Sequence, residues 1–194
     1  MESSIFKTEC LAYLAKLSNS FSEEIYIAIE SLALDLKETW LNGNQVFICG
    51  NGGSAANAIH IANDLIYGAG ACGLGEKIPG IKVEALSSNS GVLTCIANDT
   101  GYENIYSYQL DVKANQNDLL LVLSGSGNSA NIIKALEVAN LKGLKTYAIV
   151  GFDGGKCKKI ANKNIHCSIN DMEISEDIQM IIFNTCKQWL INNP

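Results

Sequence analysis

The chain has 194 residues, a net charge of −6 and 47% hydrophobic residues, which describes one globular domain over residues 1–194 rather than two domains or a disordered chain. Because only 14 residues are basic, no broad positive face is available for nucleic acid, and we expect no direct binding of DNA or RNA. No apolar run is long enough for a membrane span, no secretory signal is visible, and seven irregularly spaced cysteines favour a reducing compartment, so we expect a cytoplasmic protein.

The first forty residues predict two amphipathic helices, between about residues 4 and 40, before any strand begins. Together these helices carry more apolar positions than one face of a sheet can cover. We therefore expect one apolar row to be buried only in an assembly of several copies. The row consists of Ile25, Ile29, Leu32, Leu36 and Trp40.

Beyond a turn at 41–44, short apolar runs alternate with helical patterns. The predicted strands are 45–49, 81–86, 119–123, 146–150 and 165–168, and the predicted helices are 54–67, 90–98, 130–142 and 174–191. Strands separated by helices predict an α/β fold, with a parallel sheet that is covered on both faces. The glycine-rich stretch 67–75 predicts a surface loop.

Two of the predicted turns carry residues suited to an anion. The first strand ends in Gly-Asn-Gly-Gly-Ser at 50–54, where glycines let N–H groups converge at a helix start and Ser54 can donate a hydroxyl. The strand 119–123 ends in Ser-Gly-Ser-Gly-Asn-Ser at 124–129, and its hydroxyl groups suit the oxygens of a phosphate. Neither turn matches a Walker loop or a dinucleotide fingerprint, so we predict phosphate without nucleotide, with a nucleotide enzyme as the alternative.

Four motifs together resemble one known family. Segments 50–54, 96–99 (Ile-Ala-Asn-Asp), 124–129 and 151–156 (Gly-Phe-Asp-Gly-Gly-Lys) occur in the order and spacing of sugar isomerase (SIS) domains of the phosphoheptose isomerase type. The resemblance covers essentially the whole chain. It implies a flavodoxin-like, three-layer αβα sandwich and a homotetramer with sites between subunits. It also implies conversion of sedoheptulose 7-phosphate to D-glycero-D-manno-heptose 7-phosphate for surface polysaccharide.

The resemblance further implies that four serines hold the sugar phosphate, and that neighbouring turn residues and one helical acid complete the substrate site. The expected substrate-binding residues are Asn51, Gly52, Gly53, Ser54, Asn98, Asp99, Ser124, Gly125, Ser126, Ser129 and Glu176.

His60 and Asp64 lie four residues apart in a predicted helix, so their side chains share one face. Spacing alone favours a surface histidine near a solvated acid. The resemblance implies instead a metal ligand and a catalytic base, because enzymes of the family carry a histidine and a glutamate at these positions. Asp64 is one methylene shorter than that glutamate.

The last helix departs from the family pattern, which has a glutamine ligand early in the helix and a histidine eight residues later that serves as ligand and general acid. Depending on the register, these positions fall on Glu176 and Asn184 or on Gln179 and Lys187. Neither register supplies a histidine. We therefore expect Asp64 as the base, Glu176 as the acid, and zinc held by His60, Asp64 and Glu176.

These patterns favour a sugar-phosphate isomerase, which needs a base, an acid and a group that polarises the carbonyl. The alternative is a non-catalytic SIS protein that binds phosphosugars, such as a tetrameric regulator that binds the bacterial replication initiator protein. That branch of the family also lacks the catalytic histidine.

Overall fold

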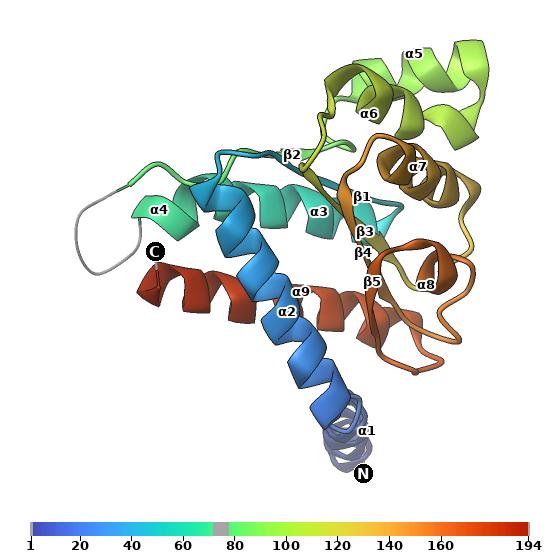
Figure 1. Ribbon diagram of the computed structural model, residues 1–194. Coiled ribbons are helices and arrows are strands. Elements are labelled where there is room, and N and C mark those ends of the chain that lie inside the picture. Colours follow the sequence, from blue (N-terminus) through green and yellow to red (C-terminus); the bar gives the residue numbers. More distant parts are fainter. Residues whose placement is uncertain (1, 72–77, 194) are drawn as a thin grey trace.

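The computed structural model describes residues 2–71 and 78–193 of the chain (Figure 1). None of the helices within these ranges has the length and apolar character needed to cross a membrane. The helices are α1 (Glu2–Ser18), α2 (Glu23–Leu41), α3 (Gly53–Asn63), the π-helix η1 (Asp64–Gly68), α4 (Ala69–Ala71), α5 (Ser90–Thr100), the 3-10 helix η2 (Tyr102–Asn104), α6 (Ser107–Lys113), α7 (Ala130–Leu141), α8 (Cys157–Ile160) and α9 (Met172–Asn192). The strands are β1 (Val46–Gly50), β2 (Val83–Ala85), β3 (Leu119–Ser124), β4 (Lys145–Val150) and β5 (Lys163–His166).

The five strands form one parallel sheet in the order β2-β1-β3-β4-β5. After β1 the chain first adds β2 on one side and then returns to add β3 on the other. In open parallel sheets, ligands bind outside the carboxyl ends of the strands where the order reverses in this way. The predicted flavodoxin-like fold is confirmed, and its topology directs attention to the ends of β1 and β3.

Two apolar cores sandwich the sheet, because successive residues of each buried strand point to opposite faces. One face packs against α2, α3 and α9, and the other packs against α5, α6, α7 and α8 (Figure 1). Strand β3 is buried along its whole length and contributes alternately to both cores, for example with Leu121 and Val122. This double burial explains why the central strands β1 and β3 are apolar runs without polar alternation.

The apolar row of α2 is already buried in a single chain, so the expectation that it needs an assembly was wrong. Ile29 and Leu36 pack in the core shared with α9 and the sheet, and even Trp40 is half-buried. Other apolar side chains on the two leading helices are left exposed. They are Ile5, Phe6, Leu11, Leu14, Tyr26, Ile27, Leu34 and Leu41.

Helix α1 is tied to the start of α9 by two polar contacts at its C-terminal end. Tyr13 Oη donates to Asp177 Oδ2 at 2.6 Å, and Lys16 Nζ donates to Asp171 Oδ2 at 2.6 Å. The contact with Asp177, more than burial, raises the pKa of the Tyr13 phenol to about 12. Helix α1 lies apart from the sheet, next to the N-terminal end of α2 (Figure 1).

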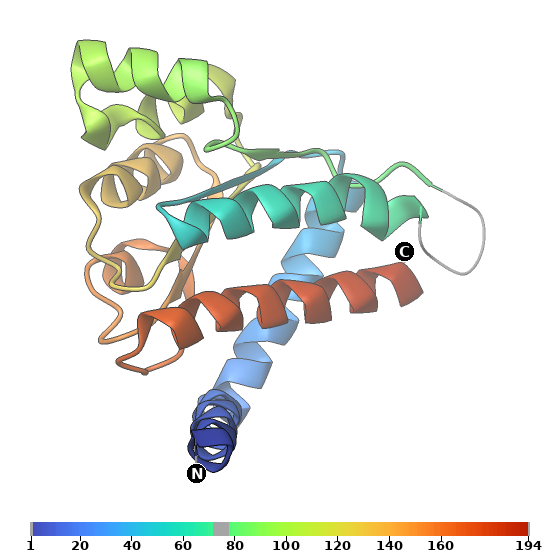
Figure 2. The ribbon, with the colours of Figure 1, turned by 180° about the vertical axis from the view of Figure 1, so that it is seen from behind.

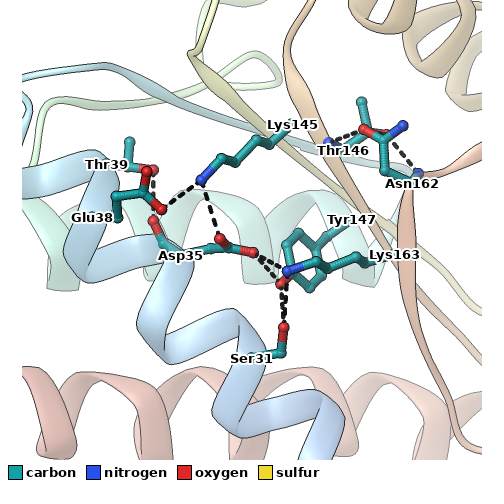
Figure 3. Close-up of polar contacts among 9 residues, drawn as sticks. All are labelled: Ser31, Asp35, Glu38, Thr39, Lys145, Thr146, Tyr147, Asn162 and Lys163. Atoms are coloured by element: carbon teal, nitrogen blue, oxygen red, sulfur yellow. Dashed lines mark hydrogen bonds and ion pairs between the residues drawn. The ribbon is translucent and has the colours of Figure 1, made fainter.

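A charged cluster fastens α2 to the amino ends of β4 and β5 (Figure 3). The buried carboxylate of Asp35 accepts hydrogen bonds from Lys163 Nζ at 2.6 Å, from Lys145 Nζ at 3.2 Å and from the Tyr147 hydroxyl. Burial alone would raise the pKa of Asp35, but these three donors outweigh it and hold the pKa below its ordinary value. The same burial, followed by the contact with Asp35, raises the pKa of the Tyr147 phenol.

Most predicted elements are found within a few residues of their expected bounds. Three short helices, η2, α6 and α8, which lie on the same side of the sheet as α7, were missed. Part of the predicted loop 67–75 is helical, since η1 and α4 extend through Ala71, and its residues 72–75 lie outside the described residues. The predicted helix 54–67 changes to π-helix at Asp64. Short π-helical segments within α-helices often occur at functional sites.

Candidate active site

A small cavity of about 110 Å³ lies where the sheet topology directs attention, outside the carboxyl ends of β1 and β3. Residues from the β1–α3 turn, the β3–α7 turn and the first turns of α9 meet there. The lining residues are Asn51, Ser54, Leu123, Ser124, Gly125, Ser126, Ser129, Met172 and Glu176. The structure therefore brings together the four serines that the sequence predicts.

The β1–α3 turn is held in place by contacts on both sides. Gly52 has a φ of +56°, a conformation that side chains other than glycine rarely adopt, and it directs the chain into α3. The amides of Asn51 and Asn131 donate to each other at 2.9 and 2.8 Å, and Tyr102 Oη donates to Asn51 Oδ1 at 3.1 Å. The turn is thus locked to the start of α7 and cannot drift away from the β3–α7 turn.

The β3–α7 turn is ordered by its own serine hydroxyls. Ser124 Oγ accepts from the N–H of Gly127 at 3.1 Å, and Ser126 Oγ accepts from the N–H of Asn128 at 3.3 Å. Gly127 has a φ of +64°, and a β-carbon there would collide with the carbonyl oxygen of Gly154. The motif 151–156 therefore supports the serine turn from behind, because the two backbones approach too closely for any side chain.

Ser54 opens α3 and is buried against α9. Its Oγ accepts a hydrogen bond from Gln179 Nε2 at 3.0 Å, and Gln179 Oε1 in turn accepts one from Asn57 Nδ2 at 3.0 Å. Since the amide of Gln179 acts as donor, the hydroxyl hydrogen of Ser54 is free to point at an anion.

Glu176 places its carboxylate directly over Gly53. A β-carbon on Gly53 would collide with both carboxylate oxygens of Glu176, so only glycine leaves this position open. A β-carbon on Gly125 would likewise collide with Met172 Sδ. The expected site residues Gly53 and Gly125 thus act by giving α9 room to approach the cavity.

The cavity offers neutral donors rather than cations, because no lysine is among the residues that line it in the described part of the chain. Helices α3 and α7 both begin at its edge, with the N–H groups of their first turns unpaired inside the helix. Aligned peptide dipoles and hydroxyls can stabilise a phosphate in such a place. The Glu176 carboxylate is the one charged group among the lining residues, and it repels an anion unless it is protonated or moves aside.

His60 and Asp64 lie at the other end of α3 and not at the cavity. At about 1.5 Å per residue, Asp64 is roughly 16 Å along the helix from Gly53, where Glu176 sits. Helices α3 and α9 run side by side in the same direction (Figure 2), so Asp64 meets a later residue of α9. Lys187 Nζ lies 3.0 Å from Asp64 Oδ1, and His60 Nε2 lies 3.6 Å from Asp64 Oδ2.

The expected zinc ligands His60, Asp64 and Glu176 are therefore not brought together within one chain. No group of three or more His, Cys, Asp and Glu side chains in residues 2–71 and 78–193 is arranged to hold a metal ion. The carboxylate that remains beside His60 already contacts an ammonium group. The donor set that the structure presents within one chain does not fit zinc.

Three positions considered in the sequence analysis, Asn98, Asp99 and Asn184, do not line the cavity. Asn98 and Asp99 are exposed on α5, where Asn98 Nδ2 donates to Asp99 Oδ1 at 2.7 Å, and neither lines the cavity. Asn184 is exposed on α9. The other histidine of the chain, His166, lies in the edge strand β5, with Nε2 3.0 Å from the Phe152 carbonyl oxygen.

Sequence reasoning missed the amides of Asn131 and Asn57, which help to position the serines. It considered Gln179 only as a metal ligand in one register of the last helix, whereas the structure places its amide against Ser54. Asn131 and Gln179 are buried polar residues on otherwise apolar helix faces, and a buried amide needs partners. That signal was present in the sequence, but identifying the partners required the relative positions of α3, α7 and α9.

Comparisons with known proteins give matches along most of the chain. Residues 9–151 match the family model described as the SIS domain. A phosphoheptose isomerase from Aliarcobacter butzleri is 37% identical over 99% of this chain and 98% of its own length. A phosphoheptose isomerase from Helicobacter pylori is 34% identical over 93% of this chain and 91% of its own length.

Solved structures show the same fold at lower identity. A phosphoheptose isomerase from Francisella tularensis superposes with a TM-score of 0.89 at 22% identity, covering all of both chains. One from Neisseria gonorrhoeae gives a TM-score of 0.83 at 23% identity, covering 95% of this chain and 98% of its own. The αβα arrangement is thus shared over the full length.

Proposed function

We propose that this chain, which belongs to the phosphoheptose isomerase family of SIS domain proteins, converts sedoheptulose 7-phosphate to D-glycero-D-manno-heptose 7-phosphate. The product would serve the synthesis of surface polysaccharide. The observation that carries the proposal is the cavity of four serines at the ends of β1 and β3. The size of the cavity and its uncharged hydrogen-bond donors suit a phosphate group. The identity of the sugar is inferred from the family relationship.

The reaction moves protons and no heavier atoms. A proton leaves C1 of the ketose as the C2 carbonyl oxygen gains one, which gives an enediol. C2 then gains a proton as the hydroxyl on C1 loses one, which gives the aldose. Carboxyl groups can perform both transfers, and we assign Asp64 as the base and Glu176 as the acid.

These two carboxyl groups cannot serve one substrate within one chain, because α3 separates them by roughly 16 Å. The cavity of about 110 Å³ is also smaller than the roughly 300 Å³ at which ligand pockets begin. It accommodates the phosphate and leaves the sugar at the surface. We propose a homotetramer in which a neighbouring copy covers the sugar and contributes the second carboxyl group.

Exposed apolar residues on α1 and α2 support an assembly. Phe6 is 72% exposed, and a groove of about 400 Å³ between α2 and α9 is lined mainly by apolar residues, including Phe21, Ile29 and Trp189. Light scattering at micromolar concentration should report a tetramer that is lost in a Phe6→Asp, Leu14→Asp double variant. Leu141→Asp, which changes a leucine on α7 that is even more exposed, should leave the tetramer intact.

We place the protein in the cytoplasm. Cys49, Cys157, Cys167 and Cys186 are buried free thiols that pack as small apolar groups. Burial raises the pKa of Cys157 and of Cys167 to about 11, which keeps both as unreactive thiols.

A second candidate is a phosphosugar-binding SIS protein without turnover. The observation that favours it is the contact of Asp64 with Lys187, which occupies the carboxylate that we assign as the base. Such a protein keeps the serine cavity and binds its ligand without converting it.

Nuclear magnetic resonance on the purified full chain with sedoheptulose 7-phosphate separates the two candidates. We expect the aldose product to accumulate with the wild type, and Glu176→Gln to lower the rate by about 10²-fold or more through loss of the acid. Glu137→Gln, an exposed glutamate on α7, is the matched control and should leave the rate unchanged. Binding without product would leave the second candidate.

A further inference from the structure

The C-terminal end of α3 carries a group of charged side chains that the predicted site does not explain. Asp64 is the first residue of η1, where the hydrogen-bond pattern widens, and the N–H of Ala69 donates to the Asp64 carbonyl oxygen. The Asp64 side chain is only 19% exposed, and its two oxygens face different partners. Oδ1 lies 3.0 Å from Lys187 Nζ, while Oδ2 lies 3.6 Å from His60 Nε2.

The fold makes room for Lys187 at this place. Gly68, the last residue of η1, is buried beneath the lysine, and a β-carbon there would lie 2.6 Å from Lys187 Cε. The Lys187 side chain is 24% exposed, so its methylene stem covers the backbone of η1 while the ammonium reaches the carboxylate. A glycine under the stem and a carboxylate at its tip define one path for this side chain.

We propose that Lys187 is the resident cation of the Asp64 carboxylate and excludes a divalent metal from this end of α3. A metal ion bound by His60 and Asp64 would have to approach the carboxylate that the ammonium contacts, and two cations at one carboxylate repel each other. The third expected ligand, Glu176, is held at the other end of α3. The site thus replaces an exchangeable ion with a covalently attached charge.

One consequence of this inference rests on the proposed isomerase function: turnover should not require a metal. Lys187 then acts as a positioning residue, because its ammonium orients the Asp64 carboxylate that we assign as the base. Its effect on metal uptake is independent of whether the protein turns over any sugar.

The test measures zinc uptake by calorimetry on the full chain after treatment with a chelator. Exposed thiols such as Cys10 and Cys95 also take up zinc, so the quantity compared is the uptake that disappears in Asp64→Asn. For the wild type we expect this difference to be zero. One equivalent of zinc that depends on Asp64 in the wild type would overturn the proposal.

Lys187→Met removes the charge and keeps the length of the side chain. We expect this variant to take up about one equivalent of zinc that disappears when Asp64→Asn is added, because His60 and Asp64 then face one ion without competition. No Asp64-dependent uptake in Lys187→Met would also overturn the proposal, since something other than Lys187 would then exclude the metal.

The matched control is Lys113→Met, in which a lysine paired with Glu84 at 2.6 Å on the other face of the sheet loses its charge. It should not change zinc uptake. Lys187→Gln serves as the second variant if the methionine lowers the melting temperature. In a separate arm, a wild type that isomerises only when zinc is added would overturn the metal-free site, whereas a wild type with no turnover would overturn the isomerase alone.

Discussion

Two polar clusters lie between helices and the sheet at opposite ends of the strands, and they differ in what their groups contact. At the amino ends, the Asp35 carboxylate is fully engaged by Lys145, Lys163 and the Tyr147 hydroxyl (Figure 3). At the carboxyl ends, Ser126 and Ser129 line a cavity, and neither hydroxyl forms a hydrogen bond with a charged side chain of the described residues.

The difference separates a cluster that holds the fold together from one that can hold a ligand. Every charge near Asp35 is neutralised by a neighbour, so a ligand would have to break an ion pair before it could bind. The serine cavity has hydroxyl donors and helix starts but no internal counter-charge for an anion. Changes at the first cluster should alter stability, and changes at the second should alter binding.

The largest expected effect is on ligand binding at the serine cavity. Ser126→Ala combined with Ser129→Ala should weaken sugar-phosphate binding about 100-fold, because two charge-assisted hydrogen bonds of about 1.5 kcal/mol each are lost. Calorimetry measures the affinity. Ser20→Ala, which removes a hydroxyl that donates to Lys16 O in α1, is the control, and an unchanged affinity in the double variant would remove these serines from the site.

Asp35→Ala should lower the free energy of unfolding by about 2 kcal/mol, since it removes the carboxylate that accepts from two lysines and a tyrosine. Lys145 keeps its contact with Glu38, and Lys163 and Tyr147 keep theirs with Ser31, which limits the loss. The loss is smaller than for a fully buried pair because both lysines are partly exposed and can be hydrated. Urea denaturation measures the change. Affinity for the sugar phosphate should remain that of the wild type, and a large loss of affinity would contradict the separation of the two clusters.

Gly53→Ala should lower turnover about tenfold, because the added methyl group displaces the flexible Glu176 carboxylate from the cavity. The free energy of unfolding should change by less than about 1 kcal/mol, as alanine is a better helix former than glycine. Gly91→Ala on the exposed α5 provides the control. Unchanged turnover together with unchanged stability would show that turnover does not depend on where the Glu176 carboxylate lies.

The smallest expected effect is the pH dependence of the Asp35 cluster. Because the folded pKa of Asp35 lies below its ordinary value of 3.8, the ionised carboxylate stabilises the fold above that value. This contribution is lost as the pH falls through the lower, folded pKa. Unfolding of the wild type and of Asp35→Asn should therefore differ most near neutral pH and converge below about pH 4, and a constant difference would exclude the ionised form as the cause.

The fold was largely predictable from the sequence because each core strand is a continuous apolar run between helical patterns. Strand β3 and its following Ser-Gly-Ser-Gly-Asn-Ser turn illustrate this, since buried strand, turn and helix follow one another without ambiguity. Helices α6 and α8 were missed because seven and four residues are too few to show a helical period.

The candidate site was predicted in part. The serines were found because hydroxyls at the carboxyl ends of parallel strands must meet at one edge of the sheet. Glu176 and Asp64 are not grouped within one chain, because this grouping depends on how α9 aligns with α3. That alignment is set by contacts such as Gly53 with Glu176 and Gly68 with Lys187. Long-range contacts of this kind leave no periodic signal in a single sequence.

A crystal of the protein soaked with sedoheptulose 7-phosphate tests most directly whether the serine cavity is the phosphate site. The phosphate should lie within hydrogen-bond distance of the hydroxyls of Ser54, Ser124, Ser126 and Ser129, with Asp35 and its partners unchanged. A phosphate bound instead to Lys145 and Lys163 at the amino ends of the strands, with the serine cavity empty, would contradict the account.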